Sequence, residues 1–178
     1  WMDGVWFNIS TPKQFKDNSR IDGCYIINAD LDFTGIVWSS TLAKESFKGQ
    51  IIGNGHKFTN ITVNQGDTSI MRGGVFGGID ATAVIKDISF ENVTYNMNAG
   101  SLKAGASFGM LAGVISNEAV IENVSASGTF NISSKIFPDT TYSIGKLSGN
   151  VIDKNIDISN ISCNVIDDTE ALSIEVNE

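Results

Sequence analysis

Residues 85–89 read IKDIS, and three other segments that share its five-residue pattern can be aligned with it. These are FTNIT at 58–62, IENVS at 121–125 and ISNIS at 158–162. Each contains an apolar residue, any residue, Asn or Asp, Ile or Val, and Ser or Thr. The fourth positions, Ile61, Ile88, Val124 and Ile161, are 27, 36 and 37 residues apart. Repetition at a period of 20 to 50 residues indicates a solenoid, a propeller or another repeat array.

A second element precedes three of the four segments. It reads GVFGGIDATAVI at 74–85, SFGMLAGVISNEAVI at 107–121 and SIGKLSGNVIDKNIDI at 143–158. Each contains an apolar residue followed by glycine, namely Phe76-Gly77, Phe108-Gly109 and Ile144-Gly145. We expect these glycines at corners, where a positive φ or a close backbone approach is required.

The period within the repeats favours strands over helices. AVIKDISF and AVIENVSASGTF alternate apolar and polar residues, which is typical of a strand with one buried face. Each repeat offers two or three short strands, whereas a propeller blade needs about four. The sequence therefore predicts an all-β fold, a right-handed parallel β-helix (solenoid) in which each repeat of residues 46–170 is one coil.

Like residues of successive coils should stack in such a solenoid. The Ile or Val of each segment should form an internal ladder. The Asn or Asp before it should stack side chain on side chain or occupy a bend, because Asn and Asp tolerate the left-handed backbone region. The predicted ladder residues are Asn60, Ile61, Asp87, Ile88, Asn123, Val124, Asn160 and Ile161.

The N-terminal third, residues 1–45, is expected to form a cap. Thr11 is a candidate N-cap, Pro12 occupies the favoured first helical position, and Gln14 completes a capping box. This predicts a short capping helix over about 12–17, followed by a strand over 24–33. The helix would cover the first open edge of the solenoid, where unpaired backbone groups are exposed. Residues 171–178 are expected to be a truncated C-terminal end.

Composition excludes several classes of protein. Charged residues make up 18% of the chain, the net charge is -8, and the only arginines are Arg20 and Arg72. Nucleic-acid binding requires a positive stripe, so no nucleic-acid partner is expected. The longest apolar runs, such as 109–115, are too short to span a bilayer, so no membrane insertion is expected. The first ten residues contain neither the basic nor the apolar region of a signal peptide.

The two cysteines, Cys24 and Cys163, lie in apolar sequence surroundings. Buried free thiols are favoured for them, and a disulfide is the alternative. The chain has no CxxC motif and no Cys/His cluster, so no zinc site is predicted.

Three segments together resemble a known family pattern. These are YIINADLDFTGIVW (25–38), FKGQIIGNGHKFTNITV (47–63) and GVFGGIDATAVIKDISFENV (74–93). They are similar to β-helix regions of large secreted bacterial surface proteins, including GLUG repeats and the regions beside the protease domain of immunoglobulin A1 metallopeptidases. The resemblance covers roughly residues 10–165 and implies a stalk, adhesin or accessory region. Ile52 stands where that pattern usually has Asp, so any role of that aspartate is absent.

His56, the only histidine, follows Gly-Asn-Gly. A catalytic histidine needs a nucleophile or an orienting acid supplied by the fold. Because GNGH is typical of a turn between strands, we interpret His56 as a turn residue, with a surface ligand contact or catalysis as alternatives.

Asp30 and Asp32 form the second candidate site. In a strand, residues two apart share a face, so both carboxylates should point away from Leu31 and Phe33. Structural or solvated carboxylates are favoured. Calcium binding and acid–base catalysis are the alternatives, although calcium prefers six to eight oxygen ligands. No cofactor is predicted, with calcium as the alternative.

Two further groups of residues have a functional and a structural interpretation. The six Asn-x-Ser/Thr sequons could be glycosylation sites. Three of them coincide with the repeat motif, so we interpret the sequons as a by-product of the solenoid. The six sequons begin at Asn8, Asn60, Asn92, Asn123, Asn131 and Asn160. Aromatic residues could stack on sugars, although packing in the cap is favoured; they are Trp1, Trp6, Trp38, Tyr95, Phe137 and Tyr142. Residues 93–107 and 130–143 are predicted to be the longer links, where a ligand surface would lie.

These observations favour a non-catalytic extracellular module, not an enzyme, that acts as a stalk or adhesive surface of a larger bacterial cell-surface protein. Its expected partners are a host or neighbouring-cell surface protein or glycan and flanking domains of the same polypeptide. It would be secreted and attached to the cell surface through the parent protein. The alternatives are a polysaccharide-binding or polysaccharide-cleaving β-helix fragment and an accessory region of a surface metallopeptidase.

Overall fold

The computed structural model describes residues 5–38, 42, 46–65, 72–99, 107–134, 141–145, 157–166 and 173–177. For residues 97–99, for 132–134 and for the strands after residue 140, only the backbone is described. Trp1 and Phe137 lie outside the described residues.

The described residues of the N-terminal part form one short helix, α1 (Pro12–Asp17), and four short strands. The strands are β1 (Trp6–Ile9), β2 (Cys24–Ile27), β3 (Leu31–Asp32) and β4 (Val37–Trp38). The later strands are β5 (Gln50–Ile52), β6 (Lys57–Thr59), β7 (Thr62–Gln65), β8 (Arg72–Gly73), β9 (Phe76–Ile79), β10 (Val84–Ala99), β11 (Ser107–Gly109), β12 (Ala112–Ile115), β13 (Val120–Ser134), β14 (Thr141–Gly145), β15 (Asp157–Ile166) and β16 (Ser173–Asn177).

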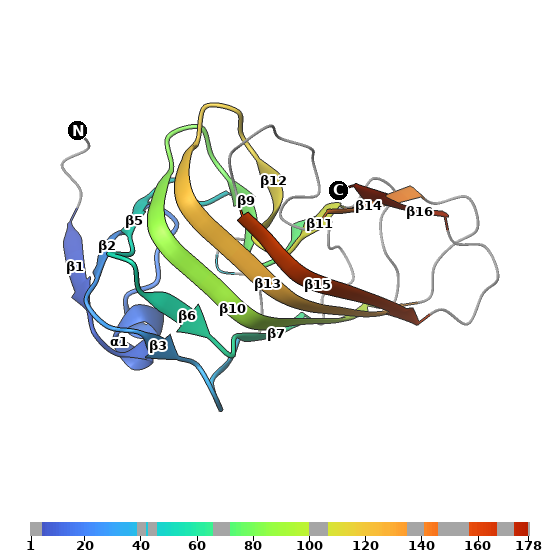
Figure 1. The fold of residues 1–178 in the computed structure, drawn as a ribbon, viewed down its shortest axis with the longest axis horizontal. Coiled ribbons are helices and arrows are strands. Elements are labelled where there is room, and N and C mark those ends of the chain that lie inside the picture. Colours follow the sequence, from blue (N-terminus) through green and yellow to red (C-terminus); the bar gives the residue numbers. More distant parts are fainter. Residues whose placement is uncertain are drawn as a thin grey trace.

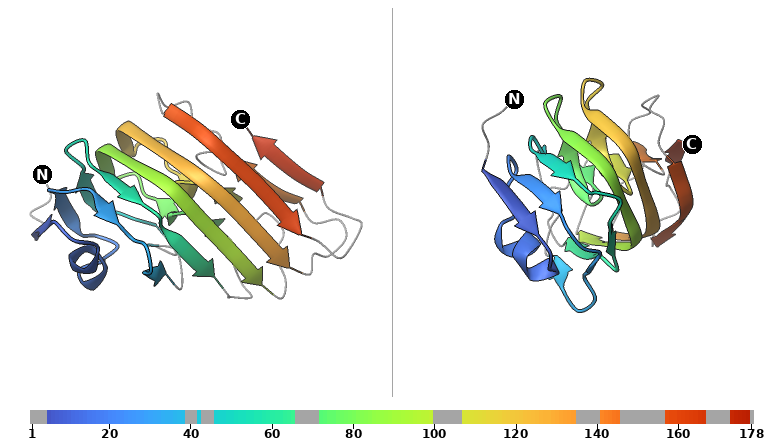
Figure 2. Two further views of the ribbon diagram at one scale, coloured as in Figure 1. Left: turned by 60° about the horizontal axis from the view of Figure 1, so that its bottom comes forward. Right: turned by 60° about the vertical axis from the view of Figure 1, so that its left-hand side comes forward.

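The strands form three sheets, shown in Figures 1 and 2. The large sheet has ten strands in the order β1-β2-β5-β10-β13-β15, with β3 and β4 paired to β6 and β7 beside this path. The second sheet is β16-β14-β11-β8, and the third is β12-β9. Every described strand pair is parallel. The predicted all-β class with parallel strands is confirmed.

The chain visits the three sheets repeatedly and in the same order. It passes from the large sheet (β5–β7) to the second (β8) and the third (β9), and then returns to the large sheet as β10. The next round runs through β11 and β12 to β13. Each long strand therefore lies directly beside its predecessor, as Figure 2 shows for β10, β13 and β15.

The pairing register corrects the predicted alignment of the four segments. IKDIS and IENVS do stack, because Ile85 pairs with Ile121 and Ile88 with Val124. FTNIT, however, lies beside residues 90–94, with Phe58 opposite Phe90 and Thr62 opposite Thr94. Ile161 pairs with Gly128, which in turn pairs with Val93. The motif therefore marks two different positions of each round, so the eight predicted ladder residues belong to two stacks.

The same register corrects part of the glycine prediction. Phe108-Gly109 pairs with Ile144-Gly145 as expected. Phe76 instead pairs with Ala112, so Phe76-Gly77 belongs to the third sheet. Gly77 and Gly109 lie within strands β9 and β11. Gly74 is one of the glycines with a positive φ, and a Cβ there would lie 2.1 Å from the Gly109 carbonyl oxygen.

Helix α1 begins as predicted. The Thr11 hydroxyl accepts a hydrogen bond from the Gln14 N–H, and the Gln14 side chain accepts one from the Thr11 N–H. Phe15 is its buried residue and packs against Tyr25, Phe33, Trp38 and Phe58 at the N-terminal end of the core. The predicted strand 24–33 is divided into β2 and β3, since the chain bends between Ile27 and Leu31.

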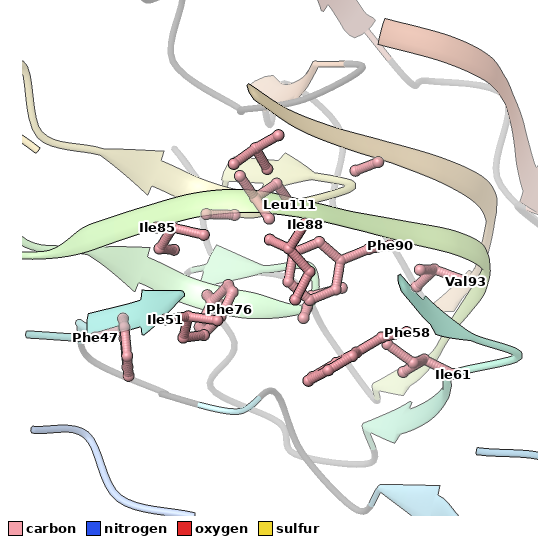
Figure 3. Close-up of a cluster of buried hydrophobic side chains, with 14 of the residues drawn as sticks. Phe47, Ile51, Phe58, Ile61, Phe76, Ile85, Ile88, Phe90, Val93 and Leu111 are labelled. Atoms are coloured by element: carbon pink, nitrogen blue, oxygen red, sulfur yellow. The ribbon is translucent and has the colours of Figure 1, made fainter. Parts of the chain in front are cut away.

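The core consists of side chains that alternate inward along the strands and stack between rounds (Figure 3). One stack contains Tyr25, Ile51, Ile85 and Ile121, and another contains Leu31, Phe58, Phe90 and Ala126. A third contains Trp38, Val63, Tyr95 and Phe130. Many of the outward residues between them are polar, although Val37 and Val120 are exposed, and the large sheet has one buried and one accessible face.

Candidate functional site

The accessible face of the large sheet contains two bends at which asparagine or aspartate adopts a left-handed backbone. Asp87 (φ 52°) and Asn123 (φ 51°) occupy the first bend, and Asn60 (φ 59°) and Asn92 (φ 52°) occupy the second. Asn tolerates this region better than other residues with a side chain. The prediction that Asn or Asp occupies a bend is confirmed at Asn60, Asp87 and Asn123.

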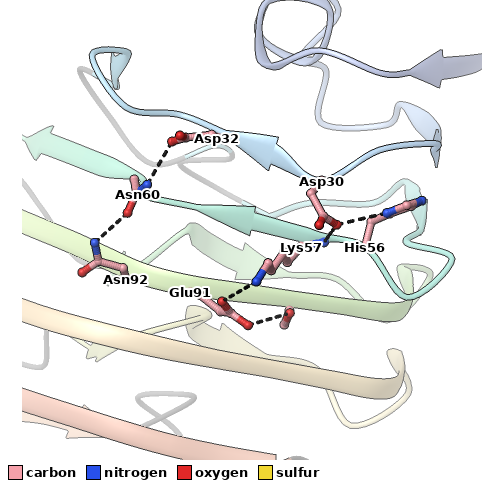
Figure 4. Close-up of polar contacts among 8 residues, drawn as sticks. Asp30, Asp32, His56, Lys57, Asn60, Glu91 and Asn92 are labelled. Carbon is pink, nitrogen blue, oxygen red and sulfur yellow. Dashed lines mark hydrogen bonds and ion pairs between the residues drawn. The ribbon is translucent and has the colours of Figure 1, made fainter.

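The side chains at these bends bond between rounds. Asn60 Nδ2 donates to Asp32 Oδ1 at 2.9 Å, and Asn92 Nδ2 donates to Asn60 Oδ1 at 2.7 Å (Figure 4). At the other bend, Asn123 Nδ2 donates to Asp87 Oδ1 at 2.9 Å. Stacking of these polar side chains therefore accompanies the bends. Asn160 lies in β15, where its side chain is outside the described part of the chain.

A third ladder lies farther along the same strands, and sequence reasoning missed it. Asn96 Nδ2 donates to Asn64 Oδ1 at 2.8 Å, and Asn131 Nδ2 donates to Asn96 Oδ1 at 2.9 Å. Thr62, Thr94 and Thr129 pair in register two residues before these asparagines. The six residues Thr62, Asn64, Thr94, Asn96, Thr129 and Asn131 are called the Thr/Asn array below.

A sequence signal for this array exists. TVN (62–64), TYN (94–96), TFN (129–131) and SCN (162–164) share a hydroxyl residue, an apolar or sulfur-containing residue and Asn. The middle residues Val63, Tyr95 and Phe130 are buried, so the flanking hydroxyl and amide residues point outward. Ser162 and Asn164 pair in register with Thr129 and Asn131.

The side chains of His56 and Asp30 contact each other on the surface (Figure 4). His56 Nδ1 lies 3.0 Å from Asp30 Oδ1, which also accepts a hydrogen bond from the Lys57 N–H at 3.2 Å. The bond from His56, followed by that from Lys57, lowers the pKa of Asp30. His56 follows a left-handed pair, Asn54 and Gly55, as expected for a turn.

Asp32 faces the same side of the sheet as Asp30 but contacts different residues. Its Oδ1 accepts from the Thr34 hydroxyl at 2.6 Å, the Thr34 N–H at 2.9 Å and Asn60 Nδ2. These donors, with the Thr34 hydroxyl first, lower the pKa of Asp32 to about 2. Leu31 and Phe33 are buried while both carboxylates are exposed, as the alternation predicts.

The geometry gives the two carboxylates structural partners. Asp30 joins the first round of strands to His56, and Asp32 begins the Asn60–Asn92 ladder. Among the described residues, no group of three or more His, Cys, Asp or Glu side chains could hold a metal ion. Calcium remains a hypothesis for these two residues.

Four of the six sequon asparagines use their amide nitrogen in the ladders. Asn60, Asn92, Asn123 and Asn131 each donate from Nδ2 to an acceptor in the preceding round. An attached glycan would replace one of the two N–H groups of such an amide and would have to fit beside the neighbouring round. This supports the interpretation of these sequons as a by-product of the repeat.

The structure shows whether several of the aromatic and cysteine residues are buried or exposed. Trp38 is buried and Trp6 is exposed. Tyr95 was expected in a link but is buried within β10, where its hydroxyl donates to Gln65 Oε1 and burial raises its pKa. Cys24 is a buried free thiol. The side chains of Tyr142 and Cys163 lie outside the described part.

The predicted links are shorter than expected. Residues 93–99 belong to β10, and residues 130–134 belong to β13. Residues 100–106 and 135–140 lie outside the described residues. Many of the residues that were predicted to form a ligand surface on long loops therefore belong to strands of the large sheet.

The chain is similar to a known protein. The chain is 30% identical to Halomucin of Haloquadratum walsbyi over 131 residues, a match that covers 65% of this chain. The chain spans about 1% of the length of this curated relative. No family model matches the chain, and no solved structure matches it.

The described residues contain no helix with the length and apolarity needed to cross a bilayer.

Proposed function

We propose that the chain is a repeat module of a larger secreted or surface-attached protein, in which it acts as a stalk with an adhesive face. The observation that carries this proposal is the stacking of successive rounds in parallel register with polar ladders on their accessible face. Such a stack extends by adding rounds, so it suits a spacer. The similarity to Halomucin supports a surface location.

The finer architecture in this proposal is a right-handed parallel β-helix of the GLUG-like type. The repeated order of visits to the three sheets supports it. Right-handed crossovers are the strong rule for parallel strands in one sheet. In this arrangement helix α1 closes the N-terminal end, with Phe15 inserted among the first core aromatics.

A non-catalytic role is part of the proposal. His56 has Asp30 as its described polar side-chain partner, and both lie on the surface, with exposed fractions of 33% and 61%. Catalytic histidines usually act on a bonded nucleophile, with an acid on the other ring nitrogen. The Asp30–His56 contact instead joins two turns of successive strands.

Surface labelling tests the location. Antibodies raised against the folded chain should label intact cells that produce the full-length parent protein, and brief protease treatment of those cells should remove the signal. Labelling that appears only after permeabilisation would overturn the proposal. A cytoplasmic protein on the same cells, probed with its own antibody, provides the control.

A further inference from the structure

The Thr/Asn array forms a regular, uncharged pattern on the accessible face of β7, β10 and β13. Along each strand, the hydroxyl and the amide are two residues apart, roughly 6.6 Å. Between strands, each group repeats at about 4.7–4.9 Å. The register that fixes this repeat is continuous from Thr62 to Thr94 and from Thr94 to Thr129.

The ladder holds the amides in one orientation. Asn96 is bonded on both sides, to Asn64 at 2.8 Å and to Asn131 at 2.9 Å. Each amide has two N–H groups and two carbonyl lone pairs, whereas one ladder bond on each side uses only one of each. The three asparagines therefore have amide donors and acceptors in fixed positions beyond those that the ladder bonds use.

The residue types of the array disfavour several partners. Neither row contains a charged residue, and the chain has a net charge of -8, so a polyanion has no attraction to this face. Protein partners are usually anchored by aromatic residues in pockets, but Val63, Tyr95 and Phe130 point into the core. What the face offers is alternating hydroxyls, amides and threonine methyl groups.

From this pattern we infer that the Thr/Asn array binds a neutral, extended polysaccharide whose chain runs across the strands. Its repeating hydroxyls match fixed donors and acceptors, and the threonine methyls contact the ring C–H groups. The repeat between strands is close to the advance of one sugar in an extended β-linked chain. Val37, which is 55% exposed and pairs with Thr62, continues the row of β-branched side chains toward the N-terminal end. This inference rests on the proposed function, because it assigns the adhesive face of the module.

Retention on insoluble polysaccharides tests the inference. The full chain would be incubated with cellulose, chitin and a β-1,3-glucan, and with insoluble polygalacturonate as an acidic comparison. We expect retention on at least one neutral polymer and none on the acidic one. Absence of retention on every neutral polymer would overturn the assignment.

A double variant locates the contact. Thr62→Val with Thr94→Val removes two hydroxyls but keeps side-chain shape and strand propensity, and we expect retention to weaken about tenfold. The matched control is Ser89→Ala with Ser125→Ala, which removes two hydroxyls from another outward position of the same sheet. Equal binding by the threonine variant and the wild type would overturn the array as the site.

Hydrogen exchange provides a readout that needs no variant. A soluble oligosaccharide of the retained polymer should slow amide exchange in peptides that contain β7 and the second half of β10. Protection confined to other segments would contradict the inference. Failure of these binding tests leaves the surface-labelling experiment unaffected, so the two proposals can fail separately.

Discussion

At the scale of single residues, left-handed asparagines and aspartates determine how the strands bend. The sequence allowed this to be predicted for Asn60, Asp87 and Asn123, because the pattern Asn/Asp-Ile/Val-Ser/Thr recurs. Asn92 is followed by Val and Thr and fits the same pattern, but the sequence did not reveal that it stacks on Asn60. The reason is physical: a left-handed bend is a local property, whereas its partner in the neighbouring round depends on pairing between distant residues.

Replacement of Asn123 separates the backbone effect from the ladder. Asn123→Ala should lower the free energy of unfolding by about 1–3 kcal/mol, since it places Ala at positive φ and removes the bond to Asp87. Asn123→Gly loses the same bond but tolerates the backbone, so it should cost about 1 kcal/mol less. Urea unfolding of both variants measures the difference. Equal destabilisation would show that the backbone conformation contributes little.

Asp32 should make the protein sensitive to acid. Its folded pKa of about 2 lies below the ordinary 3.8, because Thr34 and Asn60 donate to its carboxylate. A lowered folded pKa stabilises the fold above the ordinary pKa, and this contribution is lost as the pH falls from about 4 to 2. The urea midpoint should therefore fall less across this interval in Asp32→Asn than in the wild type.

The control for that measurement is Asp22→Asn, whose carboxylate contacts Arg20 on the surface and takes no part in a ladder. It should retain the wild-type acid response. Identical acid profiles for Asp32→Asn and the wild type would contradict the assigned role of the ladder.

At the scale of elements, α1 was predictable because its signals are local. Thr11, Pro12 and Gln14 specify the first turn without help from the rest of the chain. The break between β2 and β3 was not predictable, since residues 24–33 contain no Gly or Pro that would mark it. Likewise, the sequence predicted that Tyr95 lies in a link between strands. Its pairing with Val63 and Phe130 instead places it in the core.

Phe15 is the contact that anchors α1. Phe15→Ala should lower the free energy of unfolding by about 3–5 kcal/mol, because the ring is fully buried among four aromatic side chains. Thermal unfolding followed by near-ultraviolet circular dichroism measures this loss. Lys13→Ala, on the exposed side of the same helix, should change the stability by less than about 0.5 kcal/mol. Similar losses in the two variants would mean that α1 does not depend on its buried ring.

At the scale of the whole molecule, the repetition and the parallel stacking were predictable, but the register was not. FTNIT and IKDIS look equivalent in sequence, yet Phe58 pairs with Phe90 and Ile85 with Ile121. The five-residue pattern encodes a bend followed by an inward side chain, and each round contains two such bends. Only the pairing of whole rounds distinguishes them. The Thr/Asn array was missed because its motif lies beyond the second bend.

A charge in the core should disturb neighbouring rounds first. Ile88→Asp places an unpaired carboxylate at a buried position of β10. Hydrogen exchange followed by mass spectrometry should show lost protection in β10 and in β5 and β13, which pair with it, while α1, β1 and β2 keep theirs. Uniform loss of protection along the chain would show instead that the rounds unfold as a single unit.

The stacking of strands in chain order also determines how the module responds to force. Adjacent strands are held by bonds that run between rounds, so tension on the two chain ends loads these bonds one strand at a time. The rounds should peel off in succession and not shear together. Ladder partners are 28, 32, 35 or 36 residues apart, so each released round adds roughly 90–130 Å of contour length. A tether built in this way lengthens in steps and limits the peak load on whatever it holds.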